Sequence, residues 1–126
     1  MKRRHLKATG EYDYDYVNDI AFFKIKDREY KKSIDVNNLV VDIDKKNFVV
    51  GLQIFGASKF LRIPKKYLMK CPNWRFEANL ENNKMEVRLE YAVVIRNKVQ
   101  KIQPIIVEQL KGKYADSTVV ASPIAC

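Results

Sequence analysis

The segment that decides the fold runs from Asn38 to Leu61 and reads Asn-Leu-Val-Val-Asp-Ile-Asp-Lys-Lys-Asn-Phe-Val-Val-Gly-Leu-Gln-Ile-Phe-Gly-Ala-Ser-Lys-Phe-Leu. Two runs rich in β-branched and aromatic residues, 39–43 and 48–55, flank a polar link that ends in Asn47. This pattern predicts a β-hairpin in which Asn47 adopts the left-handed backbone conformation. Ser58 is a residue type that caps helices, so a short helix should follow the second strand.

The next segment, residues 58–71, predicts one short basic helix. Its cations are separated by three, four and four residues, a spacing that places them on one helix face: Lys59, Arg62, Lys66 and Lys70. Pro64 interrupts the pattern, because proline inside a helix removes a backbone donor. We expect either a kink at Pro64 or a second short helix with Pro64 in its first turn.

A second hairpin is indicated after the helix. Apolar and polar residues alternate on both sides of Asn82-Asn83, and two asparagines suit a tight type I′ turn. In that register Trp74 faces Tyr91, and opposite charges face each other across the strands: Glu81 and Lys84, Glu77 and Arg88, Arg75 and Glu90. Pro104 cannot donate to a ladder, which places the last strand of this unit at a sheet edge.

Near the amino terminus, Tyr12, Tyr14 and Tyr16 alternate with acidic residues, which predicts a strand. With Phe22 and Phe23, these aromatics could stack nucleic-acid bases. Ordinary burial preferences favour the other interpretation, in which they form the core of the sheet.

The pattern as a whole predicts a single α+β domain, a mostly antiparallel sheet of two successive β units joined by one short basic helix. Its parts are a basic flexible arm at 1–10, a first β unit at 11–57, the helix at 58–71, a second β unit at 73–107 and a loose tail at 108–126. Whether the two β units form one sheet or two stays open.

The charge of the chain indicates an anionic partner. The net charge is +9, and the segment from Lys45 to Lys70 contains seven basic residues and no acidic one. A regional excess of this kind is typical of an anion-facing surface, although a solvated basic face would read the same way. The apolar runs are too short to cross a bilayer and no signal-peptide core follows the basic start, so we expect a cytoplasmic protein that does not bind membranes.

The cysteines and the composition give weaker indications. Cys71 and Cys126 lack the spacing of metal ligands, so we expect two thiols, with a disulfide as the alternative if the source is a hyperthermophile. The many Lys, Ile and Val residues fit a thermophilic source.

The sequence shows no catalytic signature. His5 is the only histidine, and no serine or cysteine stands in a recognisable nucleophile context. Asp42 and Asp44, together with Asp15 and Asp19, are the carboxylates that could bind a metal, yet aspartate is also common in turns. We therefore expect neither an enzyme nor a cofactor.

Several motif pieces in the first half occur in a fixed order: Tyr14-Asp15, Asp19, Phe22, Ser33, Asp42-x-Asp44, Val-Val-Gly-Leu-Gln-Ile at 49–54, and Ala57-Ser58. Over residues 12–61 the chain resembles the small archaeal and bacterial domain of unknown function numbered twenty-two eighty-three. It departs from that pattern at Asn47, where a glycine is usual, and at Gln53, where an acid is usual. The family has no assigned activity. Some members look like partners of small toxin-like proteins encoded beside them, so the resemblance implies an interaction role.

These observations predict a non-catalytic binding module whose basic face contacts nucleic acid or another polyanion. The contacting residues would be those of the helix and the arm: Lys59, Arg62, Lys66, Lys70, Arg3 and Arg4. The alternatives are a protein-interaction or antitoxin-like partner of a neighbouring-gene protein, and a metal-dependent hydrolase at Asp42 and Asp44. A homodimer through an edge strand is also expected to be possible.

Overall fold

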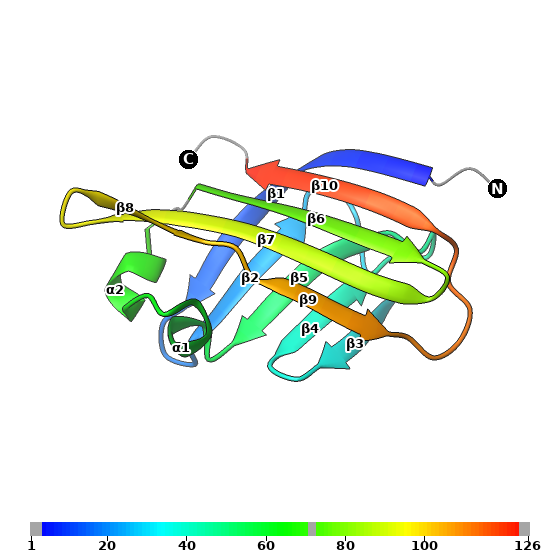
Figure 1. Ribbon diagram of the computed structural model, residues 1–126, viewed down its shortest axis with the longest axis horizontal. Coiled ribbons are helices and arrows are strands. Elements are labelled where there is room, and N and C mark those ends of the chain that lie inside the picture. The colour runs from blue at the N-terminus through cyan, green and yellow to red at the C-terminus, as the bar shows by residue number, and fades with distance from the viewer. Residues whose placement is uncertain (1–3, 71–72, 124–126) are drawn as a thin grey trace.

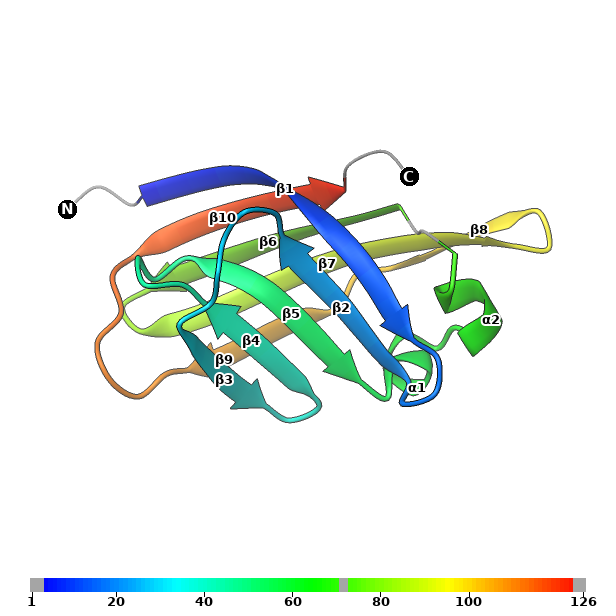
Figure 2. The ribbon, with the colours of Figure 1, turned by 180° about the vertical axis from the view of Figure 1, so that it is seen from behind.

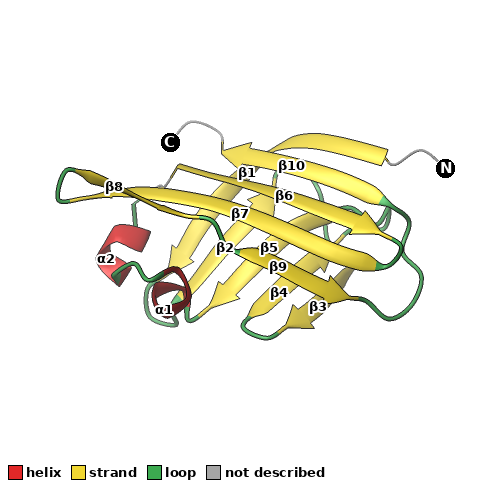
Figure 3. Cartoon of the chain, viewed as in Figure 1, coloured by secondary structure: helices red, strands yellow, loops and turns green. Residues whose placement is uncertain are grey.

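The computed structural model describes residues 4–70 and 73–123, and within these ranges the chain forms ten strands and two short helices (Figures 1 and 3). The elements are β1 (Arg4–Asp15), β2 (Ile20–Ile25), β3 (Lys32–Val36), β4 (Leu39–Ile43), β5 (Val49–Phe55), α1 (Ala57–Leu61), α2 (Lys65–Leu68), β6 (Asn73–Glu81), β7 (Lys84–Ile95), β8 (Lys98–Ile102), β9 (Ile105–Gln109) and β10 (Ser117–Pro123). No helix in these ranges has the length and apolar character needed to cross a membrane.

All ten strands belong to one sheet in the order β3-β4-β5-β2-β1-β10-β6-β7-β8, with β9 paired to β7 as well. The sheet curls over itself, so that β2 to β5 lie behind β6 to β10 and the long β1 crosses from one layer to the other (Figures 1 and 2). The apolar side chains between the layers, among them Phe23, Ile54, Phe76 and Leu89, form the core.

The prediction of an α+β fold with one helix was wrong, because the chain is mostly β and its helices hold five and four residues. Arg62 ends α1 in the left-handed conformation, with a φ of 56°. Pro64 then takes an extended ψ of 143° before α2 begins at Lys65. The expected second short helix after Pro64 is therefore present, and Gly56 stands at the N-cap of α1 where Ser58 was expected.

The expected arm at 1–10 and tail at 108–126 are also corrected. Residues Arg4–Gly10 form the first half of β1 and pair in parallel with Ser117–Pro123 of β10. Leu6 and Ala8 pack against the core. Each segment is weakly patterned alone, and each becomes a strand because the other supplies its hydrogen-bond partners.

Gly10 marks the point at which β1 passes from one layer to the other. It pairs with Pro123 of β10 on one side and with Ile25 of β2 on the other. A Cβ atom at this position would lie 2.6 Å from Cη2 of Trp74 and 3.0 Å from the carbonyl oxygen of Lys24. Glycine therefore allows the Trp74 ring to rest directly on the backbone of β1.

The two predicted hairpins are confirmed. Asn47 in the β4–β5 turn has a φ of 65°, and Asn82 and Asn83 have φ values of 51° and 62°. The β6–β7 register is the one expected, with Trp74 opposite Tyr91. The charges also pair along the strands, Arg75 with Glu77 at 3.8 Å and Arg88 with Glu86 at 2.6 Å.

The edge position expected from Pro104 is confirmed as well. Pro104 separates β8 from β9, and both strands pair with β7 only, at the end of the sheet. The carbonyl oxygen of Pro104 still accepts a hydrogen bond from the Leu89 N–H, so only the missing donor of proline breaks the ladder.

The Asp19 side chain links α1 to the β1–β2 turn through hydrogen bonds. Its carboxylate accepts hydrogen bonds from the Tyr14 hydroxyl at 2.6 Å, from the Ser58 N–H at 3.0 Å and from Ser58 Oγ at 2.7 Å. Partial burial opposes ionisation of Asp19, but these three hydrogen bonds and nearby Lys65 outweigh it and lower its pKa. Burial and the bond to Asp19 raise the pKa of Tyr14.

The Tyr12 side chain links α2 to the core through a hydrogen bond. Its hydroxyl donates to the Leu68 carbonyl oxygen at 2.8 Å and lies 3.1 Å from the Tyr91 hydroxyl. Burial raises the pKa of Tyr91 to about 12, so this pair stays uncharged at neutral pH. Both helices are thus held by side chains of β1 and its following turn.

Replacing Gly10 by alanine should destabilise the fold by about 1–3 kcal/mol, because the new Cβ must displace Trp74 or the backbone of β2. Urea denaturation measures the change in the free energy of unfolding. Thr9→Ala, at the exposed neighbouring position, is the matched control and should change it by less than about 0.5 kcal/mol. Equal stabilities of the two variants would contradict this account of Gly10.

Replacing Asp19 by asparagine should lower stability at pH 7 by about 1–3 kcal/mol, because an acceptor of three hydrogen bonds loses its charge. The folded pKa of Asp19 is lowered, so its stabilising effect is complete above the unfolded pKa of about 3.9 and disappears as the pH falls through the folded pKa. The difference between wild type and variant should therefore shrink as urea denaturation is repeated from pH 7 down to pH 3. Asp35→Asn, at an exposed position on β3, is the control. A difference that stays constant over this pH range would show that the charge of Asp19 contributes nothing.

Candidate functional site

The four cations predicted to bind phosphate lie at one end of the molecule, around α1 and α2. Lys59 is in α1, Arg62 follows it, Lys66 is in α2 and Lys70 lies just beyond α2. All four side chains are exposed, and none forms an ion pair with another residue of the described ranges. They do not share a single helix face as predicted, because the chain turns at Arg62.

A fifth cation at this end, Lys65, already contacts Tyr16 within the protein. Its ammonium group donates to the Tyr16 carbonyl oxygen at 3.1 Å and lies 5.1 Å from the centre of the Tyr16 ring. Hydrogen bonds from Asn18 are the main cause that lowers the pKa of Asp15, and the charge of Lys65 contributes to it. The carboxylates of the β1–β2 turn therefore offset part of the positive charge of Lys65.

A hollow of about 610 Å³ lies between α2 and the β7–β8 hairpin. Figure 1 shows this hairpin extending past the rest of the sheet, beyond α2. We call it the helix-end hollow; its lining includes Tyr67, Lys70, Asn73, Val94, Arg96 and Val99. It combines positive charge, an aromatic ring and an apolar wall, which are the features of a single-stranded nucleic-acid groove.

Arg96 was missed in the sequence because it lies in a turn outside the basic segment. It adopts the left-handed conformation at the β7–β8 turn, with a φ of 51°. An Arg-Asn pair between two alternating strands indicates such a turn. Pairing in the sheet is what brings Arg96 to Lys70.

Arg4 lies at the opposite end of the molecule from these four cations. It is half-buried at the start of β1, where its Nε donates to the Asp116 carbonyl oxygen at 3.3 Å and its guanidinium lies 4.7 Å from the centre of the Phe48 ring. The seven residues of β5 separate the two ends by roughly 23 Å. The structure therefore does not bring the predicted cations together, and Arg3 lies outside the described residues.

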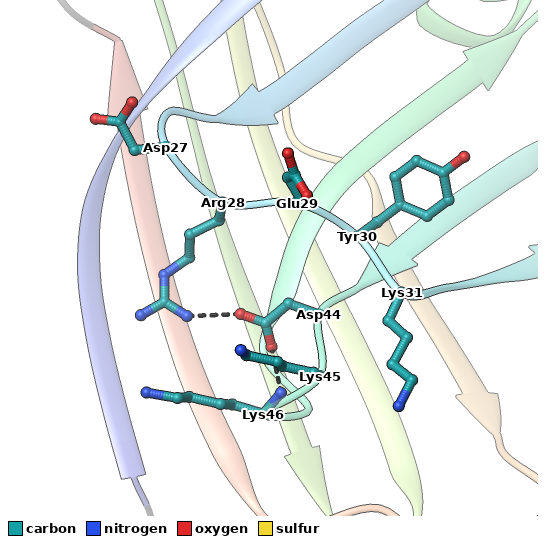
Figure 4. Close-up of a pocket in the computed structure, with 8 residues that line it drawn as sticks. All are labelled: Asp27, Arg28, Glu29, Tyr30, Lys31, Asp44, Lys45 and Lys46. Atoms are coloured by element: carbon teal, nitrogen blue, oxygen red, sulfur yellow. Dashed lines mark hydrogen bonds and ion pairs between the residues drawn. The ribbon is translucent and has the colours of Figure 1, made fainter.

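Asp44 organises the β4–β5 turn at this opposite end (Figure 4). Its carboxylate accepts the N–H groups of Lys46 at 2.9 Å and Phe48 at 3.0 Å, and pairs with Arg28 at 2.6 Å. Asp44 is 7% exposed, so its role is to close the turn and to balance Arg28.

Asp42 has a separate set of partners. It accepts a hydrogen bond from Ser33 Oγ at 2.7 Å and one from the Gln53 amide at 3.3 Å. It also packs over Gly51, where a Cβ atom would lie 2.8 Å from its Oδ2. Over residues 4–70 and 73–123 no group of three or more potential ligands could hold a metal. Cys71 and Cys126 lie outside the described residues.

The aromatic residues of β1 and β2 are mainly core residues, as their burial preference predicts. Phe23 is buried, and its ring centre lies 5.1 Å from those of Tyr12 and Trp74. Tyr16 and Phe22 are the exceptions: about half of the Tyr16 side chain is exposed, and the half-buried Phe22 is not among the residues of the core cluster. The aromatic residues available for stacking on β1 and β2 are therefore reduced to these two.

The motif residues have partners within the protein itself. Tyr14, Asp19 and Ser58 form the cluster that fastens α1, while Asp42 packs over Gly51. These contacts within the fold require the motif residues at their observed positions, and so account for the spacing of the motif. None of them places an unpaired catalytic group in a cavity.

Comparison with known proteins identifies the family that carries this motif. The family described as "Protein of unknown function (DUF2283)" matches residues 11–58. A protein of Methanosarcina mazei named "Putative hypoxanthine phosphoribosyltransferase" is 31% identical over 98 residues, which cover 76% of this chain and 78% of that protein. An uncharacterized protein of Methanocaldococcus jannaschii is 36% identical over 58 residues, 46% of this chain and half of that protein.

No solved structure matches the chain. The similarity to the Methanosarcina mazei protein extends well beyond the motif segment into the second β unit. The motif and the longer similarity together confirm the resemblance seen in the sequence, and this chain belongs to the DUF2283 family of proteins of unknown function.

Proposed function

We propose that this protein is a non-catalytic module that binds a nucleic acid through the cations at the helix end. The observation that carries the proposal is a group of exposed cations in and beside α1 and α2, without an acidic partner in the described ranges: Lys59, Arg62, Lys66 and Lys70. Of these, Lys70 lines the helix-end hollow. Such side chains neutralise the phosphates of a nucleic acid and release the cations condensed on them, which drives binding at low salt.

The helix-end hollow supports a single-stranded ligand. Lys66 lies 5.1 Å from the centre of the Tyr67 ring, so a cation and an aromatic face stand side by side. Lys70 and Arg96 line the same hollow beside the exposed Val94. A strand could lay its phosphates on the cations and place a base against Tyr67 or the valine wall.

The name of the Methanosarcina mazei relative describes an enzyme that transfers a phosphoribosyl group to hypoxanthine. We do not extend that activity to this chain, because it has only four glycines and none of them forms a phosphate-cradling loop motif. Incubation with hypoxanthine, phosphoribosyl pyrophosphate and Mg²⁺ should yield no nucleotide. Nucleotide formation above a no-protein control would show that the module is an enzyme.

The double variant Lys66→Gln/Lys70→Gln should weaken binding of a single-stranded RNA or DNA, because it removes two phosphate contacts. The dependence of log affinity on log salt should become less steep by about 1–2. Fluorescence anisotropy between 50 and 400 mM salt would measure both effects on single-stranded and duplex probes.

The matched control is Lys7→Gln/Lys24→Gln, which removes the same charge from exposed positions of β1 and β2. It should leave the affinity within about twofold of wild type, since a distant exposed charge acts only through the screened field. Absence of binding by the wild type at 50 mM salt, or equal losses in the two variants, would refute a nucleic-acid site at the helix end.

A protein partner is the second candidate, and the sheet edge favours it. Strands β8 and β9 expose Val99, Ile105 and Val107, which are 69, 57 and 50% exposed. An unpaired edge with apolar side chains can accept a strand from another chain. Co-purification with the product of a neighbouring gene would support this candidate, and Ile105→Lys should then abolish the association.

A further inference from the structure

The end of the molecule opposite the helices carries a second concentration of positive charge. Two adjoining hollows of about 510 and 360 Å³ share Lys31, Asp44 and Lys45 as lining residues. Arg28 and Lys46 line the larger one, and Lys32 and Lys113 line the smaller one. We call this pair the turn-end hollows, because both open around the β4–β5 turn.

The charges of the turn-end hollows do not balance. Six cationic side chains and three carboxylates line the two hollows, so the excess is three positive charges. In the smaller hollow the single carboxylate is that of Asp44, which is buried and paired with Arg28. In Figure 4 the side chains of Arg28, Lys45 and Lys46 gather around Asp44, while the carboxylates of Asp27 and Glu29 lie away from them. The carboxylates of the lining therefore balance only three of the six positive charges.

Arg28 is held in place before any ligand arrives. Its Nη1 donates to Asp44 Oδ2 at 2.6 Å, and its guanidinium lies 5.1 Å from the centre of the Phe48 ring. Asp44 is itself fixed by two backbone N–H groups of the turn. A guanidinium has five N–H donors, so the others stay available in a fixed planar fork that suits phosphate oxygens.

Arg4 also adds to the positive potential of this end. Its guanidinium shares the Phe48 ring with Arg28, at 4.7 Å from the ring centre. Its Nη2 is buried and has no hydrogen-bond partner among the described residues. The field of a charge withdrawn from water is screened less than that of a surface lysine.

From this geometry we propose that the turn-end hollows bind two adjoining phosphoryl groups. In the larger hollow, one phosphoryl group is bound by the guanidinium of Arg28 and the ammonium groups of Lys45 and Lys46. Lys32 and Lys113 take the next group in the smaller hollow, where Lys32 lies 5.0 Å from the centre of the Tyr114 ring. Neighbouring phosphoryl groups occur in the diphosphate of a nucleotide and along a nucleic-acid backbone. The site is separate from the helix end and does not depend on the function proposed there.

The test compares pyrophosphate, inorganic phosphate, ADP and a short oligonucleotide by isothermal titration calorimetry at low salt. Pyrophosphate should bind at least tenfold more tightly than inorganic phosphate, because it occupies both hollows. Lys45→Gln/Lys46→Gln should lose about tenfold in affinity, as expected for charge-assisted hydrogen bonds. Arg28→Lys keeps a positive partner for Asp44 but lacks the fork, and should also weaken binding.

The helix-end variant Lys66→Gln/Lys70→Gln removes the same charge and serves as the control, with an unchanged affinity for pyrophosphate. Unaltered thermal midpoints would show that all variants are folded. Binding of ADP or pyrophosphate that only the turn-end variants weaken supports a nucleotide site. Binding of the oligonucleotide that the turn-end variants weaken, with no binding of ADP or pyrophosphate, supports a backbone site. Failure of all four ligands to bind, or pyrophosphate binding that the helix-end variant weakens as much as the turn-end variants do, overturns the proposal. Because each end has its own variant, failure at one end leaves the other result interpretable.

Discussion

The whole structure depends on a single strand having different partners along its length. The first half of β1 pairs in parallel with β10, and its second half pairs antiparallel with β2. This double pairing joins the motif-bearing unit to the second β unit in one sheet and lets the sheet curl around a common core. Gly10 stands where the partners change, because the Trp74 ring occupies the space that a side chain would need.

The sequence was informative where neighbours along the chain are also neighbours in space. The β6–β7 register and the β4–β5 turn follow from alternation and from asparagines that tolerate a positive φ. The pairing of residues 4–10 with 117–123 has no local signal, so the sequence alone predicts a loose arm and a loose tail there. The spacing of the cations predicts one helix, but the left-handed turn at Arg62 and the extended Pro64 divide this segment into two shorter helices.

The candidate sites also combine residues that are close in sequence with residues that only the fold brings together. Lys59, Arg62, Lys66 and Lys70 could be named because they are close in sequence, but Arg96 reaches Lys70 only through the β7–β8 hairpin. The turn-end hollows draw on three separate loops, which contain Arg28, Lys45 and Lys113. No spacing rule could have grouped them. Conversely, the most recognisable motif residues, such as Asp19 and Asp42, serve the fold.

The pairing of β1 with β10 has a consequence for folding during translation. The ribosome releases residues 4–15 long before residues 117–123, yet the two strands must meet to complete the sheet. Until then the inner face of β1 and the side chains packed on it lack their cover. Closure across more than a hundred residues gives the fold a high contact order, and such folds form slowly. A nascent copy of this chain should therefore stay open to aggregation or to chaperones until β10 emerges.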